Sequence, residues 1–554
     1  MKWFDGPAMR PVLVVSAGII LLGGGAHVKA DFRFGTPVNL GSPSNSGYAD
    51  LMPSVSSDGL EVYFWSNRPG GFGEWDLWVS TRTTSEDEWL PATNLGPEVN
   101  SAGIDAMPCV SADGLELFFS RGSESTGELM VARRNAKTEP WGRADNLGPG
   151  VNSPARDDMP RLTSDALELY FISTRSGGCG LSDIWVATRP TMADDWGPPV
   201  NLSMVNSGGH DQWVNLSPNS LTLLFQSGRP GGEYGGLYMS RRKSRNDPWT
   251  APVYLGLPMG GSVYTLLSGI SADGGMLYLS DHINYAPRTG GLGGADMWQV
   301  PVVPIVDFDG DGKAGMQDLL RLIDSWGQDD PVVDVGPTAF GDGVVDGSDL
   351  EVLMGYWEEE VDDPTLVAHW AMDETEGTTA YDSAGLNDAA VIGAPSWQAA
   401  GGVVDGALEF DGTTCVTIAF VLNPADGPFS VCAWVKGGEP GQVIFSQQGG
   451  ANWVMASLPD GMLGTELKSA GRQSSVLTSE TVITDGNWHR IAFSWDGANR
   501  VLYVDDMEVA RDTQSSLAGS TGGLHIGAGN TLASGTFWSG LIDDVRIYDR
   551  AVWP

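Results

Sequence analysis

The sequence predicts a mainly β protein with a five-bladed β-propeller, a small helical module with acidic loops, and a second β domain built from two sheets. Three observations carry this prediction. A segment of roughly 54 residues recurs five times, an acidic stretch with two matching helical patterns follows it, and alternating apolar residues then resume. The 554 residues are enough for three or four domains, and 75 glycines and 33 prolines favour turn-rich structure.

Residues 1–30 have the pattern of a signal peptide. Lys2 and Arg10 supply positive charge, residues 12–22 form an apolar run, and residues 28–30 suit a cleavage site. The apolar run is too short to span a bilayer, and no later stretch is long enough, so we expect no integral membrane span after signal removal. A retained membrane anchor and cleavage after Ala26 are the alternatives. Export predicts a secreted protein, extracellular or at the cell surface, with the periplasm as a further location.

The charge balance argues against a nucleic-acid partner. The chain has 31 basic and 70 acidic residues, a formal net charge of −39. A surface this negative repels a phosphate backbone.

The repeated segment predicts the blades of a propeller. Each copy has a turn dipeptide, usually Asp-Gly, followed by alternating apolar residues, as in the second strand of a hairpin. A glycine-rich loop, a further short strand and a unit that begins with tryptophan complete the copy. The copies are separated by 55, 52, 54 and 54 residues and begin at Ser57, Ala112, Ser164, Pro218 and Ala272. Four strands per copy predict five blades over residues 31–305, with six blades as the runner-up.

The order of the repeated units also predicts how the ring closes. The Asn-Leu-Gly unit appears first at residues 39–41, before the first hairpin, and is missing after the strand at Trp298. We therefore expect the N-terminal strand to complete the last blade. The repeats resemble those of TolB-type propellers.

One acidic position recurs in the propeller, and we interpret it as architectural. Catalysis by a carboxylate pair needs two groups in unlike environments, whereas a residue repeated in nearly every blade suits strand capping. The position is occupied by Asp50, Asp105, Asp157 and Asp211, with Thr265 in the fifth copy. We predict no catalytic residue. His210 and residues 281–285 break the repeat and are candidates for lining a ligand mouth, with ordinary loop variation as the alternative.

The next segment has the spacing of a calcium-binding loop. Residues 307–363 hold seventeen acidic residues against two basic ones. Carboxylates at loop positions 1, 3, 5 and 12, glycine at position 6 and a main-chain carbonyl at position 7 can surround one hard cation. The predicted ligands of the first loop are Asp307, Asp309, Asp311, the carbonyl of Lys313, and Asp318.

A second, irregular copy follows 31 residues later. A shift of 31 residues places Asp318 on Asp349 and Trp326 on Trp357. Positions 1 and 3 are occupied by Thr338 and Phe340, so Asp334 would have to reach the ion across an inserted turn. The predicted ligands of the second loop are Asp334, Asp342, the carbonyl of Val344, Asp346 and Asp349. The alternative is a solvated acidic linker.

Residues 306–363 resemble a dockerin repeat pair, because each loop precedes a single short helix. The resemblance implies bound Ca²⁺ and docking onto a cohesin-type protein partner.

Residues 366–550 return to β structure. Ile491, Phe493 and Trp495 alternate onto one face before an Asp-Gly turn and a returning strand, as a two-sheet sandwich requires. The motifs at residues 369–374, 380–388, 406–412, 429–435, 488–497 and 540–548 resemble those of a LamG-like, concanavalin-A-type jelly roll. The resemblance implies a glycan or protein ligand, in some members bound through calcium. Candidate metal ligands are Asp382, Asp388 and Asp543, with turn capping as the alternative.

Four cysteines in an exported chain invite pairing. Cys415 and Cys432 lie on successive strand-like segments of one domain, and we predict a disulfide between them. Cys109 and Cys179 lie in different blades, where two buried thiols are the alternative to a bridge.

These features favour a secreted, modular binding or scaffold protein with a polysaccharide or glycoprotein ligand and a calcium-dependent docking module. The alternative is a glycoside hydrolase with a catalytic propeller. It would require two carboxylates about 5–10 Å apart from different registers of the repeat.

Overall fold

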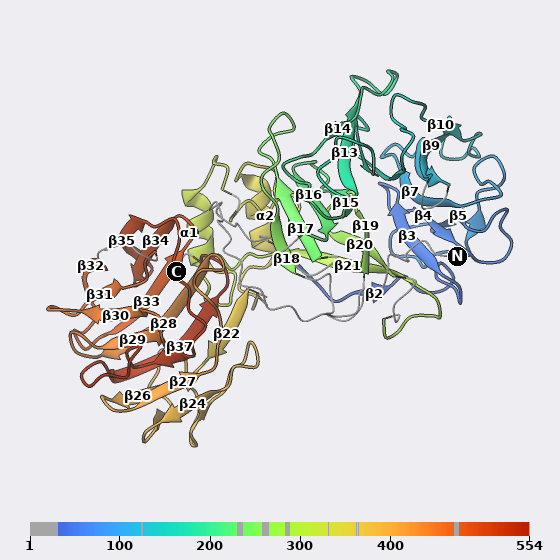
Figure 1. Cartoon of the computed structure of the whole chain (residues 1–554). Coiled ribbons are helices and arrows are strands. Elements are labelled where there is room, and N and C mark those ends of the chain that lie inside the picture. Colours follow the sequence, from blue (N-terminus) through green and yellow to red (C-terminus); the bar gives the residue numbers. More distant parts are fainter. Residues whose placement is uncertain are drawn as a thin grey trace, which may run out of the picture. The chain divides into compact units, whose positions relative to one another are not determined.

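The computed structural model describes residues 32–122, 126–229, 236–256, 265–282, 288–330, 332–361, 363, 365–469 and 476–552 (Figure 1). The predicted signal peptide lies outside these residues. The described chain divides into two compact units. One holds the residues up to Pro304 together with Trp326–Asp349, and the other holds Ile305–Ser325 and the residues from Leu350 onward. Neither described helix is long and apolar enough to cross a membrane.

The first unit contains a five-bladed propeller, as the repeat predicts. Blade 1 consists of β3 (Asp50–Val55), β4 (Glu61–Ser66), β5 (Asp76–Thr81) and β6 (Thr93–Asn94). Blade 2 consists of β7 (Asp105–Val110), β8 (Glu116–Arg121), β9 (Glu128–Arg133) and β10 (Asp145–Asn146). Blade 3 consists of β11 (Asp157–Leu162), β12 (Glu168–Ser173), β13 (Asp183–Thr188) and β14 (Val200–Asn201). Blade 4 consists of β15 (Asp211–Leu216), β16 (Thr222–Ser227), β17 (Gly236–Arg241) and β18 (Val253–Gly256).

The N-terminal segment completes blade 5, which confirms the predicted closure. The blade consists of β19 (Thr265–Ile270), β20 (Met276–Asp281) and β21 (Met297–Pro304), and β2 (Val38–Asn39) pairs with β21 as its outer strand. β1 (Phe32–Phe34) pairs with the far end of β21. The innermost strands β3, β7, β11, β15 and β19 each lie beside the next, and β19 lies beside β3. The ring is therefore closed by strands from both ends of the repeat region.

The hairpin turn of each blade needs one residue in the left-handed backbone region. Glycine takes this position in three blades, at Gly59, Gly114 and Gly274, with φ of 70° to 72°. Ala166 and Ser220 take it in blades 3 and 4, with φ of 56° and 63°. The turns of blades 1, 2 and 5 follow the Asp-Gly pattern because glycine has no Cβ to resist this conformation.

The tryptophan-led unit joins neighbouring blades. An arginine from the outer end of one blade lies over a tryptophan ring and donates to a glutamate on the second strand of the preceding blade. The ion pairs are Arg134–Glu61 at 2.7 Å, Arg189–Glu116 at 2.8 Å and Arg242–Glu168 at 3.0 Å. The stacked rings are those of Trp141, Trp196 and Trp249, with 4.3 to 4.5 Å from the guanidinium carbon to the ring centre. These partly buried cation–π and ionic contacts stabilise the packing of each blade against the preceding one.

The second unit contains a jelly roll of two eight-stranded sheets. The first sheet comprises β22 (Leu366–Trp370), β25 (Ser396–Gln398), β26 (Ala407–Asp411), β28 (Phe429–Gly437), β33 (Trp488–Trp495), β34 (Asn499–Val504), β35 (Met507–Thr513) and β37 (Ser539–Tyr548). The second comprises β23 (Thr379–Ala380), β24 (Ala389–Ile392), β27 (Cys415–Ile418), β29 (Val443–Gln447), β30 (Asn452–Ser457), β31 (Met462–Thr465), β32 (Leu477–Val482) and β36 (Leu524–Ile526).

The core of the jelly roll lies between these sheets. Ile491, Phe493 and Trp495 are all buried in it, as their alternation predicts, and β34 returns beside β33 after the Asp-Gly turn. The acidic segment forms the helices α1 (Met316–Asp324) and α2 (Gly347–Gly355).

The predicted disulfide between Cys415 and Cys432 is wrong, because all four cysteines are free thiols. Cys415 lies on β27, which pairs with β24 and β36 in the second sheet, whereas Cys432 lies on β28 in the first sheet. The chain crosses from one sheet to the other between these strands, so neighbours in sequence are not neighbours in space. Cys109 is buried and Cys179 is exposed, so the alternative of two buried thiols holds for Cys109 alone.

Candidate calcium site

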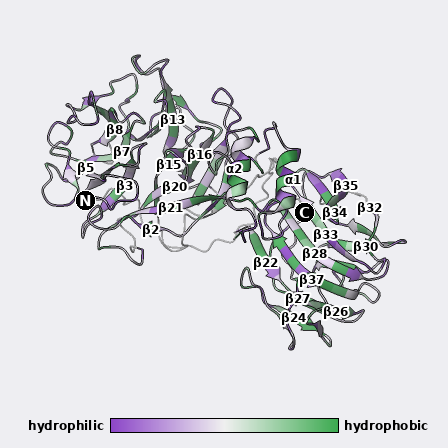
Figure 2. Ribbon diagram, turned by 180° about the vertical axis from the view of Figure 1, so that it is seen from behind, coloured by the Kyte–Doolittle hydropathy of each residue, from purple (hydrophilic) through white to green (hydrophobic). Residues whose placement is uncertain are grey.

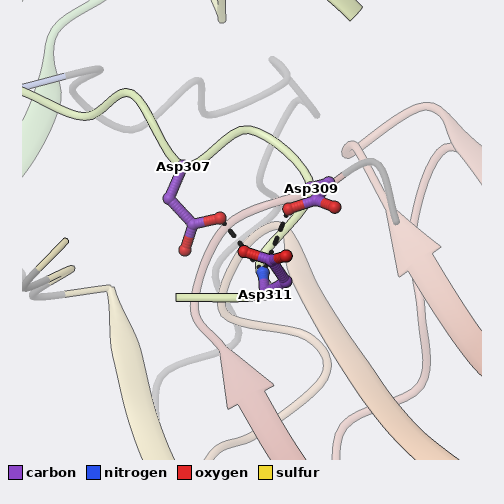
Figure 3. Close-up of side chains that lie close together, drawn as sticks. All are labelled: Asp307, Asp309 and Asp311. Carbon is purple, nitrogen blue, oxygen red and sulfur yellow. Dashed lines mark hydrogen bonds between the residues drawn. The ribbon is translucent and has the colours of Figure 1, made fainter. Parts of the chain in front are cut away.

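The first acidic loop brings three carboxylates together. Oxygen atoms of Asp307, Asp309 and Asp311 all lie within 4.8 Å of one another (Figure 3). Asp307 and Asp309 are buried, and Asp311 is exposed. Over the described residues, no other group of three His, Cys, Asp or Glu side chains has this arrangement.

Hydrogen bonds from the loop's own backbone set its shape. The carboxylate of Asp307 accepts the N–H groups of Gly310 at 2.8 Å, Asp311 at 3.1 Å and Gly312 at 3.1 Å. Gly310 and Gly312 have φ of 74° and 89°, a region in which side chains are strained. The glycines at positions 4 and 6 therefore let the chain fold around Asp307.

Asp318 connects the end of the loop to its beginning. It lies in the first turn of α1, and its carboxylate accepts N–H groups from Phe308 at 2.5 Å, Asp309 at 3.1 Å and Gly315 at 2.6 Å. Lys313 has an exposed side chain, and the role predicted for it needs only its main-chain carbonyl.

Burial of these acids without a cation raises their pKa values. Burial is the largest cause of the raised pKa of Asp307 and of Asp309. Burial and the nearby charge of Asp309 raise the pKa of Asp318 to about 7, against the opposing effect of its three backbone hydrogen bonds. Oxygen donors gathered this closely at a mostly buried site fit a hard divalent cation such as Ca²⁺.

The second loop repeats this geometry with different residues from those its spacing suggests. Asp334 accepts the N–H groups of Asp342 at 2.9 Å and Gly343 at 2.7 Å, as Asp307 does in the first loop. Asp349 accepts those of Val335, Gly336 and Asp346 at 2.7 Å, as Asp318 does. Burial raises the pKa of Asp334 to about 6.

Asp334 thus lies at loop position 1, the place that the spacing gives to Thr338. Position 3 is Gly336, which has no side chain, and Asp346 supplies a carboxylate at position 9, where the first loop has Gly315. The side chain of Asp346 accepts the N–H of Ser348 at 2.8 Å, and that of Asp342 accepts the N–H of Val344 at 3.1 Å. The inserted residues bring Asp334, already a candidate ligand from the sequence, to the first position of the loop.

The three candidate ligands in the jelly roll are not gathered around one point. The carboxylate of Asp382 accepts N–H groups from His369, Ala384 and Asn387, and Asp388 accepts the N–H of Asp382 at 3.0 Å. Asp543 accepts the N–H groups of Val403 at 2.7 Å and Val404 at 3.0 Å. These contacts are the loop and turn caps that the sequence offered as the alternative.

Sequence reasoning missed a Ser-His-Asp arrangement in the jelly roll. His369 Nδ1 lies 2.8 Å from Ser383 Oγ, and His369 Nε2 lies 2.8 Å from Asp544 Oδ1. However, Ser383 Oγ also lies 3.3 Å from the main-chain oxygen of His369, and Asp544 accepts from Arg546 at 3.0 Å. These contacts favour a structural cross-strand bridge between residues that are far apart in sequence.

The repeated aspartates of the propeller are all engaged in the same way. Each is fully buried, accepts the N–H and hydroxyl of a serine four residues earlier, and pairs with an arginine from the hairpin's far end. The sets are Ser46–Asp50–Arg68, Ser101–Asp105–Arg121, Ser153–Asp157–Arg175 and Ser207–Asp211–Arg229. Each aspartate begins the innermost strand of its blade.

The residues that break the repeat, His210 and residues 281–282, make different contacts in different blades. His210 Nδ1 lies 2.8 Å from Ser182 Oγ, which joins blades 3 and 4. Asp281 accepts the indole N–H of Trp298 at 2.9 Å, and burial lowers the pKa of His282 to about 4. Residues 283–285 of the candidate mouth lie outside the described residues.

Solved structures with similar arrangements have low scores. Domain 4 of an extracellular arabinanase from Geobacillus stearothermophilus, in complex with arabinotriose, has a TM-score of 0.28 and 21% identity, covering 34% of this chain and 93% of that chain. Trypanosoma rangeli sialidase in complex with the inhibitor DANA has a TM-score of 0.29 and 13% identity, covering 92% and 83%. The binding domain of Paraclostridial Mosquitocidal Protein 1 has a TM-score of 0.29 and 12% identity, covering 34% and 50%. These scores are too low to bear on function.

The comparison with curated proteins gives no match. Residues 410–554 match the family model of the Concanavalin A-like lectin/glucanases superfamily. The chain therefore combines a five-bladed β-propeller with a C-terminal concanavalin A-like domain.

Proposed function

We propose that the protein is a secreted, modular binding protein whose jelly roll recognises a carbohydrate, either a polysaccharide or the glycan of a glycoprotein. The observation that carries this proposal is the match of residues 410–554 to a superfamily of lectins and glucanases. The two-sheet sandwich with its own apolar core supports it. Secretion follows from the signal-peptide pattern of residues 1–30.

The propeller serves as a scaffold in this proposal. The four repeated aspartates each have a side-chain exposure of 0% and a bonded arginine. A catalytic pair would need one protonated and one ionised carboxylate able to reach a substrate, and four equivalent ion-paired groups do not provide that contrast.

The two acidic loops bind Ca²⁺ in this proposal. Bound calcium would neutralise the buried carboxylates of each loop. The first loop would hold it through Asp307, Asp309, Asp311, the carbonyl of Lys313, and Asp318. The second would hold it through Asp334, Asp342, the carbonyl of Val344, Asp346 and Asp349.

Docking onto a cohesin-type partner is the finer part of the proposal. Helix α1 is partly green, and so apolar, in Figure 2, and three of its residues keep large exposed fractions: Met316 at 59%, Leu320 at 44% and Ile323 at 51%. Exposed apolar residues at helical spacing suit contact with another protein. Gel filtration with a purified cohesin domain should give a calcium-dependent complex that Leu320→Asp abolishes.

A glycan array probed with residues 31–554 in calcium tests the main proposal. We expect binding to at least one polysaccharide class and no release of reducing ends from it. An exposed aromatic ring can stack on the apolar face of a sugar, so we expect Tyr381→Ala in the jelly roll to weaken binding. Tyr48→Ala in the propeller removes a comparably exposed ring and is the matched control. An array without any bound glycan would contradict the carbohydrate assignment, and sustained release of reducing ends would favour the hydrolase.

A further inference from the structure

The first calcium loop is fixed to the first sheet of the jelly roll by close backbone contacts. Tyr548 donates its hydroxyl to the carbonyl of Gly310 at 3.0 Å, and Arg550 donates to the carbonyl of Asp307 at 2.5 Å. A Cβ on Gly310 would lie 3.1 Å from the Tyr548 ring and 3.4 Å from Val552. The close approach and the φ of 74° at this position both favour glycine.

The face that receives the loop has its own apolar cluster. Cys432, Ala492 and Tyr503 are buried there with Tyr548 and Val552, in a cluster separate from the core between the sheets. In a sandwich without this loop the same face would be exposed to water. The loop and the sheet therefore bury each other's surface.

One arginine of this sheet contacts a carboxylate of the metal cluster. Arg490 on β33 donates to Asp309 Oδ2 at 3.3 Å and to the main-chain oxygen of Asp309 at 3.3 Å. The side chains of Arg490 and Asp309 keep exposures of 10% and 1%. Arg490 also donates to Asp506 at 3.0 Å. The guanidinium thus supplies positive charge to a buried acid that would otherwise have none when no metal is bound.

We propose that Arg490 is a positioning residue that acts as an internal counter-ion of the first calcium loop and holds the loop on the jelly roll when calcium is absent. This inference rests on the proposed calcium binding. Arg490 and Ca²⁺ both neutralise the negative charge of Asp309. When one of them is present, the other therefore stabilises Asp309 by a smaller free energy. Because the two cations repel, calcium binds more weakly when Arg490 is present, and the coupling is reciprocal.

Calcium titration of residues 31–554 by isothermal calorimetry tests the coupling. Arg490→Gln should tighten binding at the first loop on the order of tenfold at low salt, as expected when a buried like charge is removed. Arg490→Lys keeps the charge and should stay close to the wild-type affinity. Arg511→Gln, which removes an exposed arginine of the same sandwich, is the control.

Amide hydrogen exchange distinguishes a counter-ion, whose effect depends on calcium, from a residue that stabilises the fold equally with and without calcium. In chelator, Arg490→Gln should increase exchange in residues 305–325 and 539–548, and saturating calcium should restore wild-type protection. Equal loss of protection with and without calcium, or unchanged or weaker calcium affinity in Arg490→Gln, overturns the inference while leaving the proposed site intact. If the wild-type chain binds no calcium, both the site and the inference are wrong.

Discussion

Arg68 donates to the carboxylate of Asp50 at 2.5 Å, although 18 residues separate them in sequence. The pair joins the start of the innermost strand of blade 1 to the loop after its second strand. Blades 2 to 4 repeat it at 2.6, 2.5 and 3.0 Å. Blade 5 has Thr265 in place of the aspartate, and Arg288 donates to its hydroxyl at 2.5 Å. The recurrent acid is therefore part of the structural unit of each blade.

Replacing one of these aspartates should destabilise the propeller. Asp50→Asn leaves the Arg68 guanidinium, with 11% exposure, without its charged partner. We expect the free energy of unfolding to fall by about 3 kcal/mol in urea denaturation, the lower end of the range for broken buried pairs. The exposed Asp195→Asn should change it by less than about 0.5 kcal/mol. A similar small effect for Asp50→Asn would contradict the structural role.

Two exposed ion pairs between blades should make the propeller's stability depend on pH in acid. Burial raises the pKa of Asp58, but hydrogen bonds from Lys137, Ser56 and the Leu60 N–H outweigh it and lower the pKa to about 2. Asp165 behaves alike, with Arg245 as its partner. Both acids have a folded pKa below their usual value of 3.8, so their stabilisation is present above pH 3.8 and is lost as pH falls through about 2.

The double variant Asp58→Asn/Asp165→Asn should therefore lose stability at pH 7 and differ little from wild type at pH 2. Because the carboxylates are more than a third exposed, we expect no more than about 1 kcal/mol per pair. Urea midpoints across this pH range would measure the difference. An undiminished difference at pH 2 would show that the charge of these acids is not its cause.

Loss of Asp307 should remove one calcium site. Asp307 shapes the first loop through three backbone hydrogen bonds and lies in the carboxylate cluster. We expect Asp307→Asn to lower the calcium stoichiometry by one, as measured by calorimetry. Glu351→Gln, at an exposed position on α2, should leave the stoichiometry unchanged. Equal stoichiometry in Asp307→Asn would mean that calcium binds elsewhere.

The thiols should differ in reactivity. Cys179 is exposed, whereas Cys109, Cys415 and Cys432 are buried. Burial raises the pKa of Cys432 to about 12, which further suppresses its reactive thiolate. We expect a thiol reagent to label one cysteine in the native protein and four after unfolding without reductant. Two labelled cysteines after unfolding would restore the disulfide that the structure rejects.

The sequence predicts the propeller because its signal is local and repeated. Each Asp-Gly turn and alternating strand occupies about ten residues, and five copies in register leave few other folds. The jelly roll and the first acidic loop are likewise predictable from motifs that stand close together in the chain. One prediction from closeness in sequence is wrong: Cys415 and Cys432 form no disulfide, because they lie on different sheets.

The candidate site was only half predictable. Asp307, Asp309, Asp311 and Asp318 follow the expected spacing. In the second loop the spacing gives position 1 to Thr338, and Asp334 is a candidate from the sequence only through an inserted turn. A linear register cannot show how an inserted turn folds, because the backbone hydrogen bonds to the acid decide which residue occupies each position.

The sequence by itself determined the five blades, the closure by the N-terminal strand, the acidic loops and the second β domain. Periodicity and turn chemistry act between near neighbours, so they can be read along the chain. Only the tertiary structure decided the partners of the buried charges. Arg68 with Asp50, Arg134 with Glu61 and Arg490 with Asp309 are separated by 18, 73 and 181 residues. A buried acid is stabilised by whichever cation the folded chain brings beside it, and that choice has no local signal in the sequence.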